Sequence, residues 1–104
     1  MKVEELTKKI KQEVQKEDSG AQVILFGSRA RGNPTAESDW DILVLSSKSA
    51  VGFKDEQTIR HRLYDIELET GQSISTFVYS LNEWNTRLIH TPFYDSVKRD
   101  GIYL

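Results

Sequence analysis

The sequence predicts a small α/β domain, of the α+β kind, in which helices flank one mixed sheet. Three observations support this fold class. Apolar residues recur at helical spacing in several segments, three short runs are apolar or β-branched enough for strands, and glycine, proline or serine separates these segments. In chain order the segments are helix, strand, strand, helix, strand, helix and helix. The chain has 104 residues, which is room for one modest core, so residues 1–104 are expected to form a single domain.

The first helix is predicted over residues 2–17, where four apolar side chains recur every three or four positions: Val3, Leu6, Ile10 and Val14. The polar run 18–20 ends it. The strand that follows, 22–26, is short and almost wholly apolar, which favours a central position in the sheet. Residues 33–38 have the composition of a loop, and residues 40–45 form a second apolar strand.

A second helix is predicted over residues 55–70, because its apolar residues fit a helical pattern: Ile59, Leu63 and Ile66, with Leu68 as a further candidate. Gly71 stands where a left-handed C-cap would end this helix. Residues 74–79 are mostly β-branched and aromatic, which is typical of a strand. This part of the chain therefore has the pattern of a helix that leads into a third strand.

The C-terminal part is predicted to hold two further helices. Ser80 and Glu83 have the spacing of a capping box, so one helix is expected to start at Leu81. Pro92 suits the first turn of a last helix that ends near Arg99. Among the aromatic residues here, Trp84 and Phe93 are expected in the core, and Tyr94 and Tyr103 in the core or on a contact surface.

Composition narrows the class of protein. The net charge of −2 lacks the basic excess of a general nucleic-acid binder, so nucleic acid is not expected as a partner. The chain has no cysteine, which excludes disulfides and thiolate metal sites. Its N-terminal segment lacks the apolar centre of a signal peptide, and no run approaches the ~20 apolar residues of a membrane span. A cytoplasmic protein without membrane association is expected.

The first functional motif directly follows the strand at 22–26. Gly27 lets the backbone approach a phosphate closely because it has no Cβ, and Ser28 adds a hydroxyl where a helix could begin. Arg29 and Arg31 are near enough to neutralise a triphosphate. By itself, a Gly-Ser-Arg sequence is most often a plain turn.

The second motif opens the next strand. Asp39 and Asp41 are two positions apart, so on a strand their carboxylates share one face, whereas Trp40 turns to the other face and into the core. Mg²⁺ prefers a few carboxylates together with waters and substrate phosphates. An isolated Asp-x-Asp commonly just caps a loop. Because it stands here beside the Gly-Ser turn, the two motifs together predict a site for a nucleoside triphosphate and Mg²⁺.

The combination Gly-Ser, ten residues (29–38) and Asp-x-Asp resembles that of the minimal nucleotidyltransferases of the polymerase-beta-like superfamily, over residues 23–45. The resemblance implies transfer of a nucleoside monophosphate from ATP or a relative to a hydroxyl, with pyrophosphate leaving. It assigns Gly27 and Ser28 to the triphosphate, and Asp39 and Asp41 to catalysis and Mg²⁺. The antitoxin-type members further imply a toxin–antitoxin pair, in which a small helical partner protein is modified or bound.

The sequence departs from this family at one position. Members that catalyse usually offer a third carboxylate from the neighbouring strand, and here Ser75 or Ser73 stands about where it would be. Neither His61 nor His90 occupies a motif position, so both are expected to be exposed rather than to act as a base. Three interpretations follow: a transferase with an incomplete carboxylate set, a weakened nucleotide-binding or partner-binding module, and a metal-binding fold with unrelated chemistry.

Overall fold

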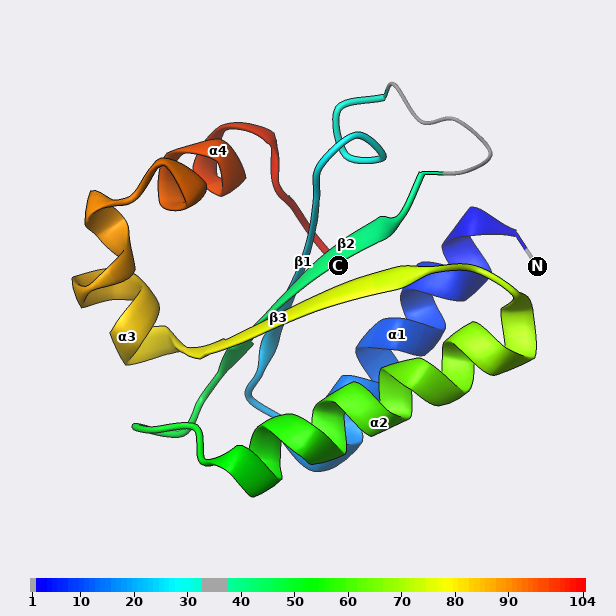
Figure 1. Cartoon of the computed structure of the whole chain (residues 1–104), viewed down its shortest axis with the longest axis horizontal. Coiled ribbons are helices and arrows are strands. Elements are labelled where there is room, and N and C mark those ends of the chain that lie inside the picture. The colour runs from blue at the N-terminus through cyan, green and yellow to red at the C-terminus, as the bar shows by residue number, and fades with distance from the viewer. Residues whose placement is uncertain (1, 33–37) are drawn as a thin grey trace.

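The computed structural model describes residues 2–32 and 38–104 and has the predicted order of helices and strands (Figure 1). The elements are α1 (Val3–Glu17), β1 (Gln22–Phe26), β2 (Trp40–Ser46), α2 (Phe53–Thr70), β3 (Ile74–Ser80), α3 (Leu81–Thr86), the 3-10 turn η1 (Leu88–His90), α4 (Pro92–Asp100) and β4 (Ile102–Tyr103). The structure also contains two short elements that were not predicted, η1 and β4. The predicted loop at 33–38 lies, apart from Ser38, outside the described residues.

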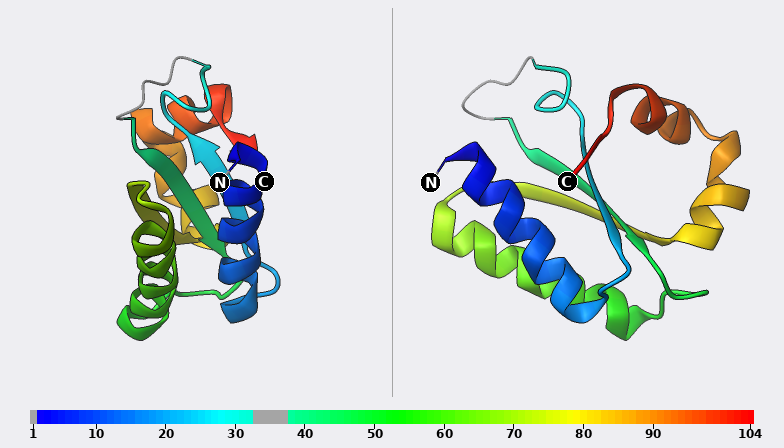
Figure 2. Two further views of the ribbon diagram at one scale, coloured as in Figure 1. Left: turned by 90° about the vertical axis from the view of Figure 1, so that its right-hand side faces the viewer. Right: turned by 180° about the vertical axis from the view of Figure 1, so that it is seen from behind.

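The strands form one mixed sheet in the order β3-β2-β1-β4. Strand β1 runs antiparallel to both β2 and β4, whereas β2 and β3 are parallel and are joined through α2. The predicted central position of β1 is therefore confirmed. Helices α1 and α2 cover one face of the sheet, and α3 and α4 lie over the other (Figures 1 and 2). The mixed α/β fold class predicted from the sequence is correct.

Two apolar clusters hold these layers together, one on each face. The cluster under α1 and α2 includes Leu6, Ile10, Val14, Val23, Ile42, Val44, Ile59, Leu63 and Ile66, and the cluster under α3 and α4 includes Ile24, Leu43, Leu45, Trp84, Leu88 and Val97. Strand β2 contributes alternate residues to both clusters, which explains the unbroken apolar run from Ile42 to Leu45. The chain thus buries both faces of its sheet.

The helix ends follow the predicted signals. Gly71 has a φ of +74° and its N–H donates to the Glu67 carbonyl, so it ends α2 as a left-handed cap. The Ser80 hydroxyl accepts a hydrogen bond of 3.0 Å from the Glu83 N–H at the start of α3. Pro92 lies in the first turn of α4. None of the helices within the described ranges is both long and apolar enough to cross a membrane.

Two apolar residues of the predicted helical patterns are exposed. Val3, the first residue of α1, is 58% exposed. Leu68 is 68% exposed because it follows Ile66 by only two positions, which on a helix places it on the opposite side from the buried stripe. Trp84 is buried as predicted, Phe93 is partly buried, and Tyr103 is mostly exposed on β4.

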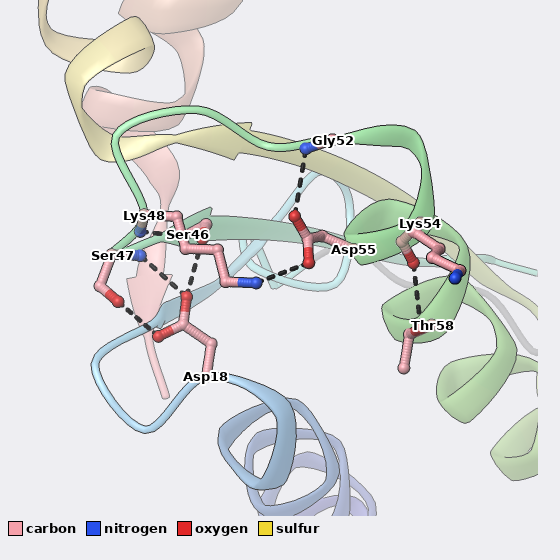
Figure 3. A network of polar contacts seen from close by, with 8 residues as sticks. All are labelled: Asp18, Ser46, Ser47, Lys48, Gly52, Lys54, Asp55 and Thr58. Atoms are coloured by element: carbon pink, nitrogen blue, oxygen red, sulfur yellow. Dashed lines mark hydrogen bonds and ion pairs between the residues drawn. The ribbon is translucent and has the colours of Figure 1, made fainter.

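A polar network secures the end of the sheet where β2 finishes (Figure 3). The Asp18 carboxylate, just after α1, accepts hydrogen bonds from the Ser46 hydroxyl at 2.7 Å and from the Ser47 N–H at 2.9 Å. Burial alone would raise the pKa of Asp18, but the hydrogen bonds from Ser47 and Ser46 outweigh it and lower this pKa. Asp18 therefore ties the α1–β1 turn to the end of β2 in its ionised form.

Candidate functional site

The Gly27 turn lies at the opposite end of β1. Gly27 has a φ of +77°, and its carbonyl accepts hydrogen bonds of 3.1 Å from the N–H groups of both Ala30 and Arg31. This geometry is one helical turn, and Gly32, with a φ of +79°, follows it. No regular helix begins at Ser28 within the described part of this loop, because the second left-handed glycine reverses the backbone after a single turn.

The strand pairings bring the acidic motif beside this turn. In the antiparallel pair, Asp41 lies opposite Phe26, the residue before Gly27, and in the parallel pair Asp41 lies beside Ser75. A Cβ added to Gly27 would lie 2.1 Å from Asp41 Oδ2, so the carboxylate occupies the space that a side chain at position 27 would need. The glycine turn and the carboxylate are therefore in direct contact.

Asp39 completes the acidic pair. It is exposed just before β2, and its Oδ2 accepts a hydrogen bond of 3.3 Å from the Ser75 hydroxyl. Asp39, Asp41 and Ser75 thus share the sheet face that α3 and α4 partly cover, because residues two apart on a strand and partners on adjacent strands point the same way. The structure brings the two predicted motifs together.

The electrostatics of the pair favour a cation. Burial raises the pKa of Asp41, the nearby Asp39 raises it further, and Arg31 opposes this rise. The two carboxylates repel each other, and a bound cation would relieve this repulsion. Both offer oxygen atoms as metal ligands, which suits Mg²⁺ better than a softer metal. Within residues 2–32 and 38–104, no three acidic, histidine or cysteine side chains gather into a metal-binding group. The residues therefore fit a cation whose remaining ligands are phosphates and water.

The two predicted phosphate-binding arginines have different surroundings. Arg29 donates from Nε and Nη2 to the Ser38 carbonyl at 3.1 and 2.8 Å, and its guanidinium lies 4.2 Å from the centre of the Trp40 ring. Arg29 thus ties the loop to the start of β2. Arg31 is exposed and acts electrostatically on Asp41. Phosphate binding by Arg29 stays a prediction.

The remaining sequence expectations concern residues around the site. Trp40 is buried as predicted, and its Nε1 donates to Gln72 Oε1 at 3.0 Å. Ser75, rather than Ser73, is the strand neighbour of Asp41. Glu69 of α2 pairs with a lysine of α1 over the other sheet face. The imidazoles of both predicted surface residues are exposed: His61 on α2 and His90 on η1.

Sequence reasoning missed an aromatic group next to the carboxylates. Phe26, Phe77 and Phe93 form a triangle with ring centroids 5.3 to 5.5 Å apart. The period-two alternation of the strands could have placed Phe26 and Phe77 on the face of Asp41. The contact with Phe93 depends on how α4 folds back over the sheet, which the local sequence pattern does not specify.

Comparisons with known proteins identify the class of protein to which this fold belongs. The family described as nucleotidyltransferase domain matches residues 7–101, so the chain belongs to this family. It is 33% identical over 104 residues, covering 98% of both chains, to the Methanocaldococcus jannaschii protein named "Putative protein adenylyltransferase MJ0141". The predicted family membership is confirmed.

A solved structure shares the fold. It is titled "Crystal structure of the toxin-antitoxin with AMP-PNP", and it superposes with a TM-score of 0.62 over 92% of this chain and 69% of the other chain. The sequence identity in this pair is 17%. The likeness therefore shows a common arrangement of helices and strands.

Proposed function

We propose that this chain binds a nucleoside triphosphate, ATP above others, together with Mg²⁺, and transfers the nucleoside monophosphate to a hydroxyl on a partner protein. The observation that carries the proposal is the contact between Gly27 and the Asp41 carboxylate. A phosphate at the glycine turn and a cation on the carboxylate would be neighbours, as a metal-bound triphosphate requires.

Each group has a role in this reaction. The backbone of the Gly27 turn and the Ser28 hydroxyl hold the phosphates, and Arg31 neutralises their charge. Asp39 and Asp41 would hold Mg²⁺, which supplies charge neutralisation to the phosphate oxygens when it is bound. The acceptor hydroxyl loses its proton to water, and its oxygen forms a bond to the α-phosphorus while the bond from that phosphorus to the pyrophosphate oxygen breaks. Alignment and charge neutralisation by these residues supply most of the rate.

The choice of acceptor and nucleotide draws support from the similar proteins. One relative carries a name that describes transfer of adenylyl groups to protein, and the structure of similar fold is a toxin–antitoxin complex with an ATP analogue. We therefore take ATP as the nucleotide and a small helical protein as the partner, in an antitoxin-like pair. The proposal places the protein in the cytoplasm, where ATP and Mg²⁺ are available.

Ser75 favours a second candidate function. Its hydroxyl donates to Asp39, and it lies beside Asp41 on the strand from which the family resemblance implies a third carboxylate, but it brings no negative charge. A neutral group does not hold a second cation or raise the basicity of the attacking oxygen. In this alternative, the chain is a nucleotide-binding module with weak turnover that acts through contact with its partner.

The experiment that separates these functions uses radiolabelled ATP, the purified chain and a candidate partner, with and without Mg²⁺. A transferase labels the partner only with Mg²⁺, and Asp39→Ala abolishes labelling, whereas Asp65→Ala, an exposed acid on α2, leaves it unchanged. A binding module forms an unlabelled complex with its partner that withstands Asp39→Ala. Failure of the wild-type chain to bind any triphosphate saturably contradicts both functions and favours a metal-binding fold with unrelated chemistry.

A further inference from the structure

A partly exposed aromatic ring lies beside the candidate site. Phe77 follows Ser75 by two positions on β3, so both side chains point to the same sheet face. The ring contacts Phe26 and Phe93 at centroid distances of 5.5 Å each. Phe77 therefore belongs to the aromatic layer that borders the carboxylates.

The exposure of Phe77 is unusual for this face of the sheet. Its ring is 38% exposed, whereas Leu43, its strand partner on β2, is fully buried. Strand β3 is the edge of the sheet, and an open groove of about 310 Å³ runs along it. Phe77 lines this groove together with Tyr79, Glu83 and residues of α2. An aromatic side chain at the wall of a groove offers a flat apolar surface for a ligand.

The order of the strands gives the direction in which a bound nucleotide would extend. The phosphate turn follows β1, the carboxylates lie on and just before β2, and Ser75 lies on β3. A triphosphate with its far end at the turn and its α-phosphate at the carboxylates directs its nucleoside toward β3. Residues two apart on a strand are separated by about 6 to 7 Å, which is comparable to the span of a ribose between phosphate and base.

We propose that Phe77 is the stacking platform for the nucleobase of the triphosphate, an assignment that rests on the proposed function. The base lies in the groove along β3 with one face on the Phe77 ring, while Phe26 and Phe93 support the ring from below. Ser75, two positions before Phe77 on the same face of β3, is the strand neighbour of Asp41. Because every base has an aromatic face, this contact adds affinity for the nucleoside with little selection among bases.

The test compares two ligands by titration calorimetry in the presence of Mg²⁺: ATP, and inorganic tripolyphosphate, which lacks the nucleoside. Phe77→Ala should weaken ATP binding by about tenfold, the effect of losing one stacked base, and leave tripolyphosphate binding within about twofold. Phe77→Leu keeps much of the packing volume and should show the same selective loss. Phe77→Trp should retain ATP affinity.

Phe53→Ala is the matched control, because Phe53 is 78% exposed at the start of α2 and takes no part in the aromatic layer. It should bind both ligands as the wild-type chain does. The stacking role of Phe77 would be overturned if Phe77→Ala and Phe77→Leu lost affinity for ATP and tripolyphosphate equally. It would also be overturned if both variants bound ATP as tightly as the wild-type chain. The proposed function would stand in either case. A wild-type chain that binds neither ligand would overturn the proposed function itself, and the platform with it.

Discussion

Gly27→Ala tests the contact on which the proposed site depends. The substitution adds one methyl group at a φ of +77° and 2.1 Å from Asp41 Oδ2. Ordinary van der Waals contact begins at 3.4 Å, so the carboxylate must retreat by about 1.3 Å. A left-handed backbone costs alanine about 1 to 2 kcal/mol, which a less flexible unfolded chain partly offsets. The forced displacement costs roughly a further 1 to 3 kcal/mol.

Gly71→Ala and Gly32→Ala separate strain from displacement. These glycines have φ values of +74° and +79°, and an added Cβ at either would meet nothing within 4 Å. Each control should lower the free energy of unfolding by about 1 kcal/mol in urea titrations. Gly27→Ala should lower the free energy of unfolding more than either control, because only at position 27 must a carboxylate move to make room for the new methyl group.

Binding provides the second measurement. A misplacement of about 1 Å at a site of this kind can cost on the order of 100-fold in rate, so Gly27→Ala should lose nearly all Mg²⁺-dependent transfer and about tenfold in Mg²⁺–ATP affinity. Gly71→Ala should retain both the transfer activity and the affinity for Mg²⁺–ATP. If Gly27→Ala bound Mg²⁺–ATP as tightly as Gly71→Ala does, the turn and the Asp41 carboxylate would not form one site and the reasoning would be refuted.

Three further predictions concern charge. Asp41→Asn should raise the free energy of unfolding at pH 7 by up to about 1 kcal/mol while abolishing Mg²⁺-dependent ATP binding, because the raised pKa of Asp41 makes its ionised form costly in the fold. Ser75→Asp should add a second Mg²⁺ per chain in calorimetric titrations with ATP, whereas Ser73→Asp should not. Asp18→Asn should destabilise the chain by about 1 kcal/mol at pH 7, since it weakens the charged hydrogen bonds at the end of β2.

The pH dependence of the two aspartate variants has opposite sign. The gain in free energy of unfolding in Asp41→Asn should shrink as the pH falls. It should vanish below about pH 3.8, where Asp41 is protonated in both the folded and the unfolded wild-type chain. The loss in Asp18→Asn should instead shrink as the pH falls through the lowered folded pKa of Asp18. A pH-independent effect in either variant, or an unchanged metal stoichiometry in Ser75→Asp, would contradict the corresponding assignment.

Local patterns predicted most of the secondary structure, because helix caps and strand alternation act over a few residues. Gly71 ends α2 and Ser80 caps α3 as their neighbours in the sequence indicated. Leu68 lies outside the buried stripe of α2, because it follows Ile66 by two positions and so faces the opposite side of the helix. Strand β4 was missed because two residues carry no periodicity, and its pairing with β1 is a long-range contact.

The sequence by itself determined which chemical groups are available: a glycine that tolerates a left-handed turn, two aspartates on one side of a strand, and a serine where a third acid would stand. The tertiary structure decided which of them meet. The register places Ser75, rather than Ser73, beside Asp41, and the Ser38 carbonyl accepts hydrogen bonds from Arg29. These outcomes depend on register and on helix packing across the sheet, which many distant residues set together and no single segment encodes.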